Sequence, residues 1–250
     1  MESENVTLAS ACCNRPPAVI EYTPKGEMFH LKNGLRCYIT GSKDSKAAII
    51  HSYDIFNYHP NAFHAADIFA DAGFRVIMPD MFRDHPVRME MMGDRQKIMD
   101  RLNAVGTFDN LYDDYKAVKE YLVKDEGFDK LLLAGHCWGS CMSMRFSAHD
   151  ADFLGAALFH PSLVNSADFY NIQCPVILQP SMEDPDWSVE YKAITEKPFG
   201  KLCYYQRFDD MYHGWTSGRG EWYDPYIKKR ADEAFANAIR GFNRILDARS

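Results

Sequence analysis

Six short apolar runs constrain the fold of this chain more than any other feature of its sequence. Apolar and polar positions do not alternate within them, and longer segments containing polar residues separate them. Strands of this kind are typical of a parallel sheet that helices cover on both faces. The six runs are Ala47–Tyr53, Arg75–Pro79, Lys130–Ala134, Phe153–Phe159, Pro175–Gln179 and Lys201–Phe208.

The segments between and after these runs have the periodicity of helices. Their apolar residues recur every three or four positions, which gives each helix one apolar face. The clearest examples are Ala62–Ala72, Asn110–Lys124 and Pro225–Ala248. Right-handed crossovers between parallel strands place helices on both faces of a sheet. The sequence therefore predicts a three-layer α/β/α sandwich with a mostly parallel central sheet.

An antiparallel hairpin is expected before the parallel part of the sheet. Glu27–Lys32 and Leu35–Thr40 flank Asn33-Gly34, a dipeptide that suits the positive φ angles of a tight turn. Residues 1–26 are polar and contain prolines, so we expect an irregular N-terminal extension. Residues 27–250 are expected to form a single domain.

Composition narrows the range of partners and compartments. The net charge of −7 over 250 residues argues against a nucleic-acid surface. No apolar run approaches the roughly 20 residues of a membrane helix, and the first residues lack the basic region of a secretory signal. We therefore expect a cytoplasmic protein without nucleic-acid or membrane partners, either a monomer or a weak homodimer.

The seven cysteines do not suggest a disulfide framework, and most are expected to be free thiols. Cys12-Cys13 could form a metal or redox pair, but no further Cys/His spacing typical of zinc completes it. We predict neither a metal nor an organic cofactor.

The chemistry is expected at the turn after the run Lys130–Ala134. The sequence there reads Gly135-His136-Cys137-Trp138-Gly139, which is Gly-x-Cys-x-Gly between a predicted strand and a predicted helix. This is the arrangement of a nucleophile elbow, with cysteine in the place of serine. A strained turn needs small residues two positions either side, and a helix N-terminus favours a thiolate. The N–H of Trp138 could donate to an oxyanion. A buried cysteine in an ordinary strand–helix turn is the alternative.

A thiol nucleophile needs a base and an acid that orients the base. In this fold both are expected later in the chain, in loops that follow strands. His213 follows the run ending at Phe208 and is the predicted base. Asp184, after Gln179, is the best candidate acid, although spacing alone leaves Glu183 and Asp186 as competitors. His160, at the end of another run, could line the pocket, although a structural role is the more common one for such a residue.

The segment from about Met28 to Leu246 resembles the dienelactone hydrolase (carboxymethylenebutenolidase) family of α/β-hydrolases. The resemblance lies in the Gly-x-Cys-x-Gly elbow, in Ser181–Asp184 and in His213-Gly214-Trp215. It implies an α/β-hydrolase fold and a catalytic triad of Cys137, Asp184 and His213.

The resemblance also implies further site residues. Asp54 occupies the position at which family members carry a glutamate that holds the resting thiol, and it is one methylene shorter. The N–H of Ile55 would then be the second oxyanion donor. Arg219, beyond the predicted base, is a candidate for substrate binding, because the bacterial enzymes bind a carboxylate with arginines.

Together these features predict a cysteine-dependent hydrolase of small esters or lactones that forms a thioester intermediate. Enol lactones and aryl esters are the favoured substrates, because a thiolate leaves a tetrahedral adduct more readily than an alkoxide does. Two alternatives belong to other classes. One is a non-catalytic ligand-binding or scaffold protein on the same fold, and the other is thiol redox sensing through Cys137 and Cys141.

Overall fold

The computed structural model describes residues 15–83 and 85–249. They contain an eight-stranded sheet in the order β1-β2-β4-β3-β5-β6-β7-β8, in which β2 is antiparallel to both of its neighbours and the remaining pairs are parallel. The strands are β1 Glu27–His30, β2 Arg36–Thr40, β3 Ala48–Ser52, β4 Arg75–Pro79, β5 Leu131–His136, β6 Phe153–Phe159, β7 Val176–Gln179 and β8 Tyr204–Tyr205. The mostly parallel sheet with an N-terminal antiparallel hairpin is confirmed.

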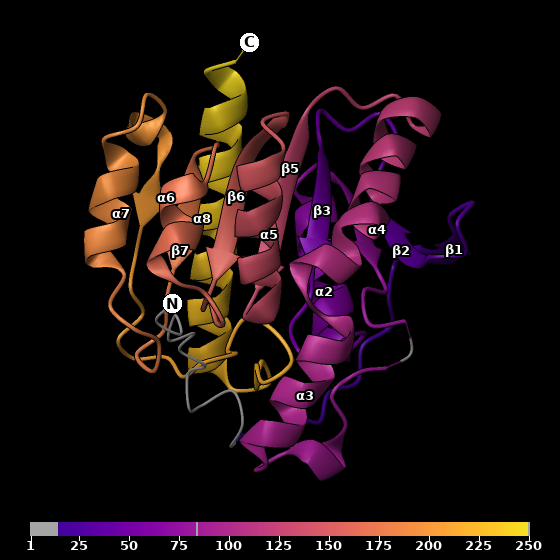
Figure 1. Ribbon diagram of the computed structural model, residues 1–250, viewed down its shortest axis with the longest axis vertical. Coiled ribbons are helices and arrows are strands. Elements are labelled where there is room, and N and C mark those ends of the chain that lie inside the picture. Colours follow the sequence, from indigo (N-terminus) through magenta and orange to yellow (C-terminus); the bar gives the residue numbers. More distant parts are fainter. Residues whose placement is uncertain (1–14, 84, 250) are drawn as a thin grey trace.

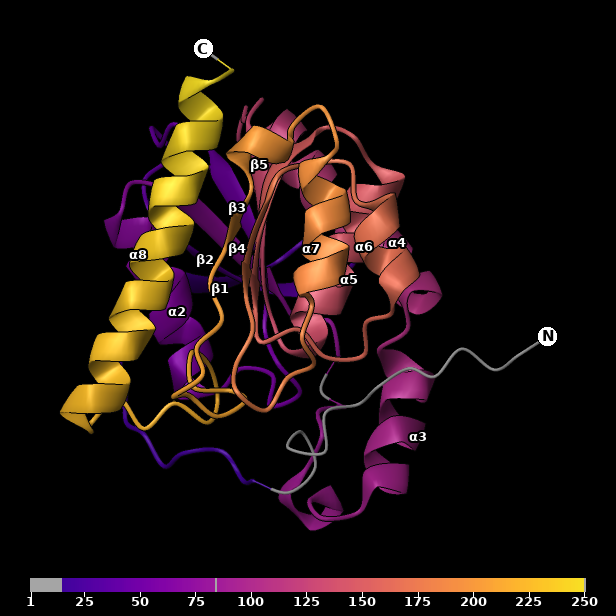
Figure 2. The ribbon, with the colours of Figure 1, turned by 90° about the vertical axis from the view of Figure 1, so that its left-hand side faces the viewer.

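Helices cover both faces of the sheet, as predicted (Figures 1 and 2). Helices α2 and α8 lie on one face, and α4, α5, α6 and α7 lie on the other, while α3 lies beyond the loops at one end of the sheet. The helices are α2 Pro60–Asp71, α3 Arg95–Val105, α4 Phe108–Glu120, α5 Trp138–His149, α6 Ser166–Asn171, α7 Ser188–Thr195 and α8 Pro225–Asp247, with short helical turns η1 Met89–Met91, η2 Tyr121–Asp125 and η3 Gly200–Leu202. The result is a three-layer α/β/α sandwich of the α/β-hydrolase type.

The central strands are apolar throughout because helices cover them on both sides. Every residue of β3, β4, β5 and β7 is buried. Helix α8 shows the opposite pattern: its buried residues form one stripe that includes Phe235, Ala238, Phe242 and Ile245, and its other face is polar. Burial of this stripe attaches the C-terminal helix to the sheet.

Two predicted elements differ from the structure. The hairpin loop is wider than a two-residue turn, because Leu31 and Leu35 close it with a backbone hydrogen bond and Asn33 Oδ1 accepts from the Leu35 N–H. The run Lys201–Phe208 forms only the two-residue strand β8, preceded by η3. Phe208 is nevertheless fully buried and forms an isolated parallel bridge with Ser181, outside strand β8.

The described part of the N-terminal segment, residues 15–24, forms neither helix nor strand. The Tyr22 ring stacks on His64 with 4.3 Å between centroids, and the Tyr22 hydroxyl donates to Asp67 in α2 at 2.8 Å. The Ala18 N–H donates to the Gly218 carbonyl at 2.8 Å. The segment is therefore attached to α2 and to a loop near the end of the sheet. Cys12 and Cys13 lie outside the described residues.

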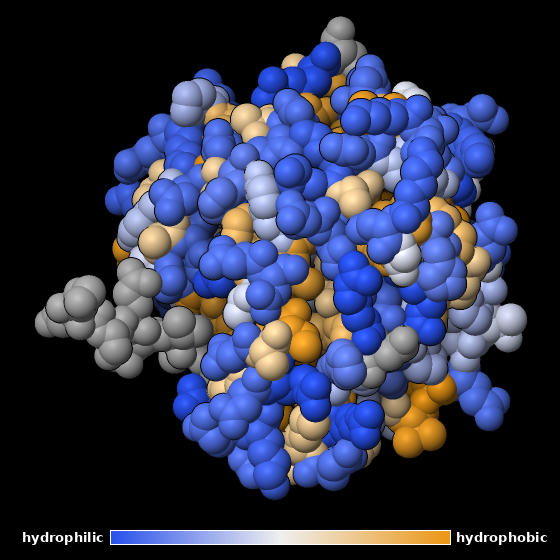
Figure 3. All heavy atoms as spheres, turned by 45° about the vertical axis from the view of Figure 1, so that its right-hand side comes forward, coloured by the Kyte–Doolittle hydropathy of each residue, from blue (hydrophilic) through white to orange (hydrophobic). Residues whose placement is uncertain are grey.

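The surface facing the viewer in Figure 3 is mainly hydrophilic, and apolar residues show mostly in hollows between hydrophilic side chains. In the described ranges no helix is both long enough and apolar enough to cross a bilayer.

Candidate active site

A strained turn joins β5 to α5. Cys137 occupies it with φ 54° and ψ −116°, a conformation that costs energy for any residue with a side chain. Its neighbours two positions away must be glycines. A Cβ on Gly135 would lie 2.3 Å from the Gly139 carbonyl oxygen, and a Cβ on Gly139 would lie 2.3 Å from the Ser52 carbonyl oxygen. The Gly-x-Cys-x-Gly pattern is thus required by the close approach of helix and strands.

Backbone strain among the described residues is concentrated at one edge of the sheet. All the non-glycine residues with positive φ lie in loops that follow the carboxyl ends of β3, β4, β5 and β6. Ligand sites of open α/β sheets lie at this edge, and strain of this kind collects at functional sites. The residues are Asn57, Arg83, Cys137, His160 and Leu163.

The same edge carries a buried histidine–carboxylate pair. His213 Nδ1 and Asp184 Oδ1 are 2.6 Å apart, and neither side chain is accessible to solvent. The other oxygen, Asp184 Oδ2, accepts from the backbone N–H of Ser181 at 2.6 Å and from its hydroxyl at 2.8 Å. With Asp184 ionised, the proton of a neutral His213 ring stays on Nδ1, and Nε2 is left as an acceptor.

The two competitors of Asp184 make other contacts. Glu183 Oε2 accepts from the backbone N–H of His213 at 2.8 Å, so this carboxylate holds the main chain of the loop and not the ring. Asp186 Oδ1 accepts from the backbone N–H of Ser188 at the start of α7. Of the three acidic residues, Asp184 is the one paired with the imidazole.

Arg207 fixes the loop that carries Asp184, a role that the sequence did not reveal. Its guanidinium donates to the carbonyl oxygens of Met182, Asp184 and Pro185 at 2.9 to 3.0 Å. Three carbonyls held by one planar group restrict the loop far more than a surface ion pair does. A basic residue six positions before His213 is the only sequence signal for this contact.

His160 is fully buried and packs edge-on against His213, with 4.8 Å between ring centroids. Its Nε2 lies 2.8 Å from the Thr216 hydroxyl, which also lies 3.0 Å from His136 Nδ1. Burial, with a contribution from nearby histidines, holds the pKa values of His160 and His136 well below their usual range. Behind them, His51 is 5.1 Å from His136 between centroids, and burial lowers its pKa to about 3. These three rings are neutral in the folded protein.

Asp54 lies beside the loop that follows His213. Its Oδ2 accepts from the Ser217 hydroxyl at 2.5 Å and from the Gly218 N–H at 2.9 Å. Its Oδ1 accepts from the Phe56 N–H at 2.9 Å. Asp54 therefore joins the loop after β3 to the loop of the histidine. Ile55, the next residue, is buried in the same turn.

Arg219 is 2% exposed and lies against the N-terminal segment. Its Nε donates to the Arg15 carbonyl at 2.6 Å, and its guanidinium lies 4.9 Å from the ring centroid of Phe56. Arg15 in turn lies over the ring of Tyr212 at 4.0 Å. The contact of Arg219 with Arg15, together with the Ala18–Gly218 hydrogen bond, holds residues 15–18 against the histidine loop. The role of Arg219 in substrate binding stays a prediction.

Trp138 provides the first residue of α5. The leading N–H groups of a helix lack partners within the helix and carry its positive dipole end. The Trp138 indole donates to the Gly106 carbonyl at 2.8 Å and stacks near Tyr53 and Phe82, so the start of the helix is firmly held.

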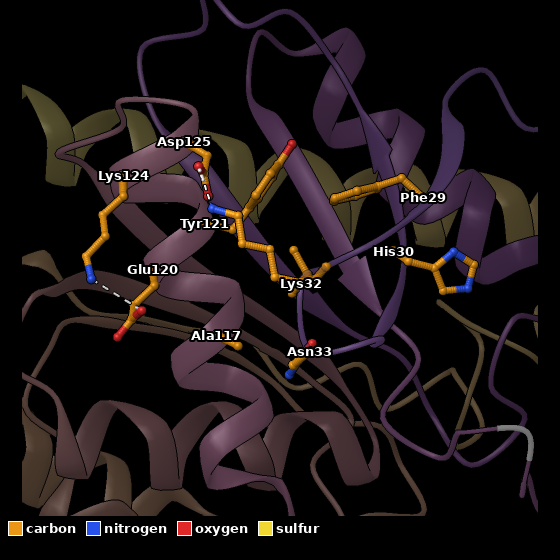
Figure 4. A pocket seen from close by; sticks show the side chains of 10 residues that line it. Phe29, His30, Lys32, Asn33, Ala117, Glu120, Tyr121, Lys124 and Asp125 are labelled. Carbon is orange, nitrogen blue, oxygen red and sulfur yellow. Dashed lines mark hydrogen bonds and ion pairs between the residues drawn. The ribbon is translucent and has the colours of Figure 1, made fainter.

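One sizeable cavity is remote from these residues. About 600 Å³ lies between the β1 hairpin and the α4–η2 segment, and its walls include Phe29, Tyr121, Lys32 and Lys124 (Figure 4). Its charged groups pair with one another, as Lys32 does with Asp125. No triad candidate lines it. Within residues 15–83 and 85–249, no cluster of three His, Cys, Asp or Glu side chains is arranged to hold a metal ion.

Comparison with known proteins adds independent information. The model of the dienelactone hydrolase family matches residues 35–246. An uncharacterised AIM2-family protein of Schizosaccharomyces pombe is 28% identical, with 90% of this chain and 93% of that protein covered. The human carboxymethylenebutenolidase homologue is 23% identical, with 91% and 94% covered.

Solved structures share the fold. A proposed dienelactone hydrolase of Klebsiella pneumoniae superposes with a TM-score of 0.66 over 88% of this chain and 95% of that one, at 14% identity. The family match spans the elbow, the histidine–carboxylate pair and nearly the whole sheet. The chain therefore belongs to the dienelactone hydrolase family, and it is a hydrolase.

Proposed function

We propose that the protein hydrolyses small esters or lactones through a thioester on Cys137, with His213 as the base and Asp184 as the acid that orients it. One observation carries the proposal: a cysteine at φ 54° at the end of β5 shares a sheet edge with a buried histidine whose Nδ1 is 2.6 Å from a carboxylate. This combination is difficult to explain by stability alone, because the strained turn and the buried carboxylate both cost free energy.

In the first step the Cys137 sulfur attacks the substrate carbonyl carbon, and His213 Nε2 takes the thiol proton. The carbonyl oxygen becomes an oxyanion, which the backbone N–H groups of Trp138 and Ile55 would bind. Each such donor contributes about 3 to 4 kcal/mol in a comparable protease site. Asp184 holds the imidazole in the tautomer that can accept this proton.

In the second step the adduct collapses to a thioester. The carbon–oxygen bond to the leaving group breaks, and His213 returns the proton to the departing oxygen. Water, activated by the same ring, then attacks the thioester and releases the acid and the thiol. Because thiolate is the better leaving group, enol lactones and aryl esters are expected to react faster than alkyl esters.

The surrounding residues act by positioning the triad. Glu183 holds the backbone of His213, and Arg207 holds the carbonyls around Asp184. We propose that Asp54 maintains the histidine loop through Ser217 and Gly218, because these two donors already engage its Oδ2. The family resemblance predicts that the same carboxylate holds the resting thiol.

Cys137 is 1% exposed, so substrate reaches the sulfur only when part of its cover moves. This closed state is the one observation that favours the alternative of a non-catalytic protein. The discriminating experiment is a panel of aryl esters, enol lactones and ethyl esters, measured with wild type, Cys137→Ala and the buried-thiol control Cys37→Ala. The proposal predicts that only Cys137→Ala abolishes turnover. Equal activity in all three proteins would contradict it.

A further inference from the structure

A groove of about 150 Å³ runs between α3 and α5. In Figure 1, α3 lies below the N-terminal end of α5. The apolar part of its lining comes from Met99 and Leu102 of α3, Trp138 and Met142 of α5, and Leu163 after β6. Trp138 and Met142 are four positions apart, so they lie on one face of α5 and continue the groove away from the nucleophile turn.

Two hydrogen bonds join the walls of this groove to the residues of the nucleophile turn, although Cys137 itself does not line it. The Trp138 indole donates to the carbonyl of Gly106, which lines the groove, at 2.8 Å. The Ser162 N–H, one residue before Leu163, donates to the Cys137 carbonyl at 3.2 Å. The walls are therefore attached to the turn that carries the sulfur.

We propose that this groove binds the acyl group of the substrate, and that this group is neutral, apolar and about four to six carbons long. The inference rests on the proposed function, because it needs an acyl group on Cys137. None of the groove residues belongs to the loops of His213 or Asp184. Because His213 protonates the leaving group, the leaving group lies on the side of Cys137 that faces His213. The acyl group that stays on the sulfur can then occupy the opposite side, where the groove lies.

The charge of the groove argues for a neutral acyl group. Of the described residues that line it, Arg145 is the only charged one, and it already pairs with Asp168 through Nε at 2.8 Å and a second guanidinium nitrogen at 3.3 Å. A carboxylate there would compete with Asp168, whereas an alkyl chain contacts the apolar walls. In a well-studied engineered protein, an apolar cavity of comparable volume holds benzene, which has six carbons. Methionine side chains adapt readily to such ligands.

The test compares p-nitrophenyl acetate, butanoate, pentanoate and octanoate on wild type and Met99→Trp. Met99 is half-buried in the groove, so the larger ring fills space without replacing a core residue. Met92→Trp is the matched control, since Met92 is also half-buried but lines no part of the groove. Circular dichroism verifies folding, and Met99→Phe serves if the tryptophan variant is unfolded.

In wild type, kcat/KM is expected to rise about fourfold per methylene up to pentanoate, as burial of each methylene predicts, and to gain nothing further at octanoate. Met99→Trp is expected to lower the pentanoate-to-acetate ratio at least tenfold, whereas Met92→Trp keeps the ratio within twofold. A flat chain-length profile in wild type would overturn the proposal, and so would equal ratios in the two variants.

A binding measurement separates this inference from the proposed function. Calorimetric titration of Cys137→Ala with p-nitrophenyl pentanoate is expected to give a Kd that weakens at least tenfold in Cys137→Ala/Met99→Trp. An unchanged Kd would overturn the acyl site. Full hydrolytic activity in Cys137→Ala would instead overturn the proposed function, whatever the Kd values are.

Discussion

Replacing His51 by leucine is expected to make the protein less sensitive to acid. His51 is fully buried, and its two ring nitrogens have no hydrogen-bond partner in the part of the chain that the structure describes. Burial lowers its pKa from 6.5 to about 3. The folded protein therefore keeps the ring neutral, whereas the unfolded chain binds a proton below about pH 6.5.

The sign follows from the order of the two pKa values. Because the folded value is the lower one, the neutral ring is fully compatible with folding above pH 6.5, and stability is lost as the pH falls from 6.5 toward 3. Between pH 7.5 and 5.5 one such ring costs about 1.4 kcal/mol of unfolding free energy. His136 and His160, whose pKa values burial also lowers, add to this loss in the same direction.

Urea unfolding followed by tryptophan fluorescence at pH 7.5 and 5.5 measures this effect. The loss of unfolding free energy between the two pH values is expected to be about 1.4 kcal/mol smaller in His51→Leu than in wild type. His30→Leu is the control, because His30 is exposed to water in the folded protein. A pH dependence in His51→Leu equal to that of wild type would refute the reasoning.

Three further predictions concern the site. Asp184→Asn removes the partner that fixes the His213 tautomer, and kcat is expected to fall by about 10⁴, as the equivalent change does in a serine protease; a loss below tenfold in steady-state assays would contradict this role. Glu183→Ala removes the acceptor for the His213 backbone N–H and is expected to lower kcat about tenfold, roughly the free energy of one such hydrogen bond. Glu183→Gln keeps an acceptor and is expected to keep most of the activity. Equal losses in the two variants would refute a positioning role. A phenyl ester is expected to have a higher kcat than the matching ethyl ester in stopped-flow assays, and equal rates would argue against rate-limiting acylation by a thiol.

The sequence predicted the parts of the fold that local patterns encode. Apolar runs and helical periods identified the parallel sheet and its layers. The Gly-x-Cys-x-Gly pattern marked the turn because the backbone around Cys137 packs too closely for a Cβ on Gly135 or Gly139. The end of the sheet was less predictable. Phe208 is buried in the core, and its apolar side chain extended the predicted strand to position 208. In the structure β8 ends at Tyr205.

Long-range contacts explain what the sequence could not reveal in the site. Chain order singled out His213 and left three acids, and only the folded loop pairs Asp184 with the ring. Arg207 meets the carbonyls of that loop from about 20 residues away. The Thr216 hydroxyl between His136 and His160 joins its own loop to the end of strand β5 and to the loop after β6. Such contacts depend on tertiary packing, which no local pattern records.

The most direct test of the central claim is the mass of the protein during turnover. Wild type is mixed with p-nitrophenyl butanoate, quenched in acid within milliseconds, digested and analysed by mass spectrometry. The account predicts one butanoyl group on the peptide that contains Cys137, released by hydroxylamine and absent from Cys137→Ala. Turnover with the acyl group on any other residue, or turnover that persists in Cys137→Ala, would contradict it.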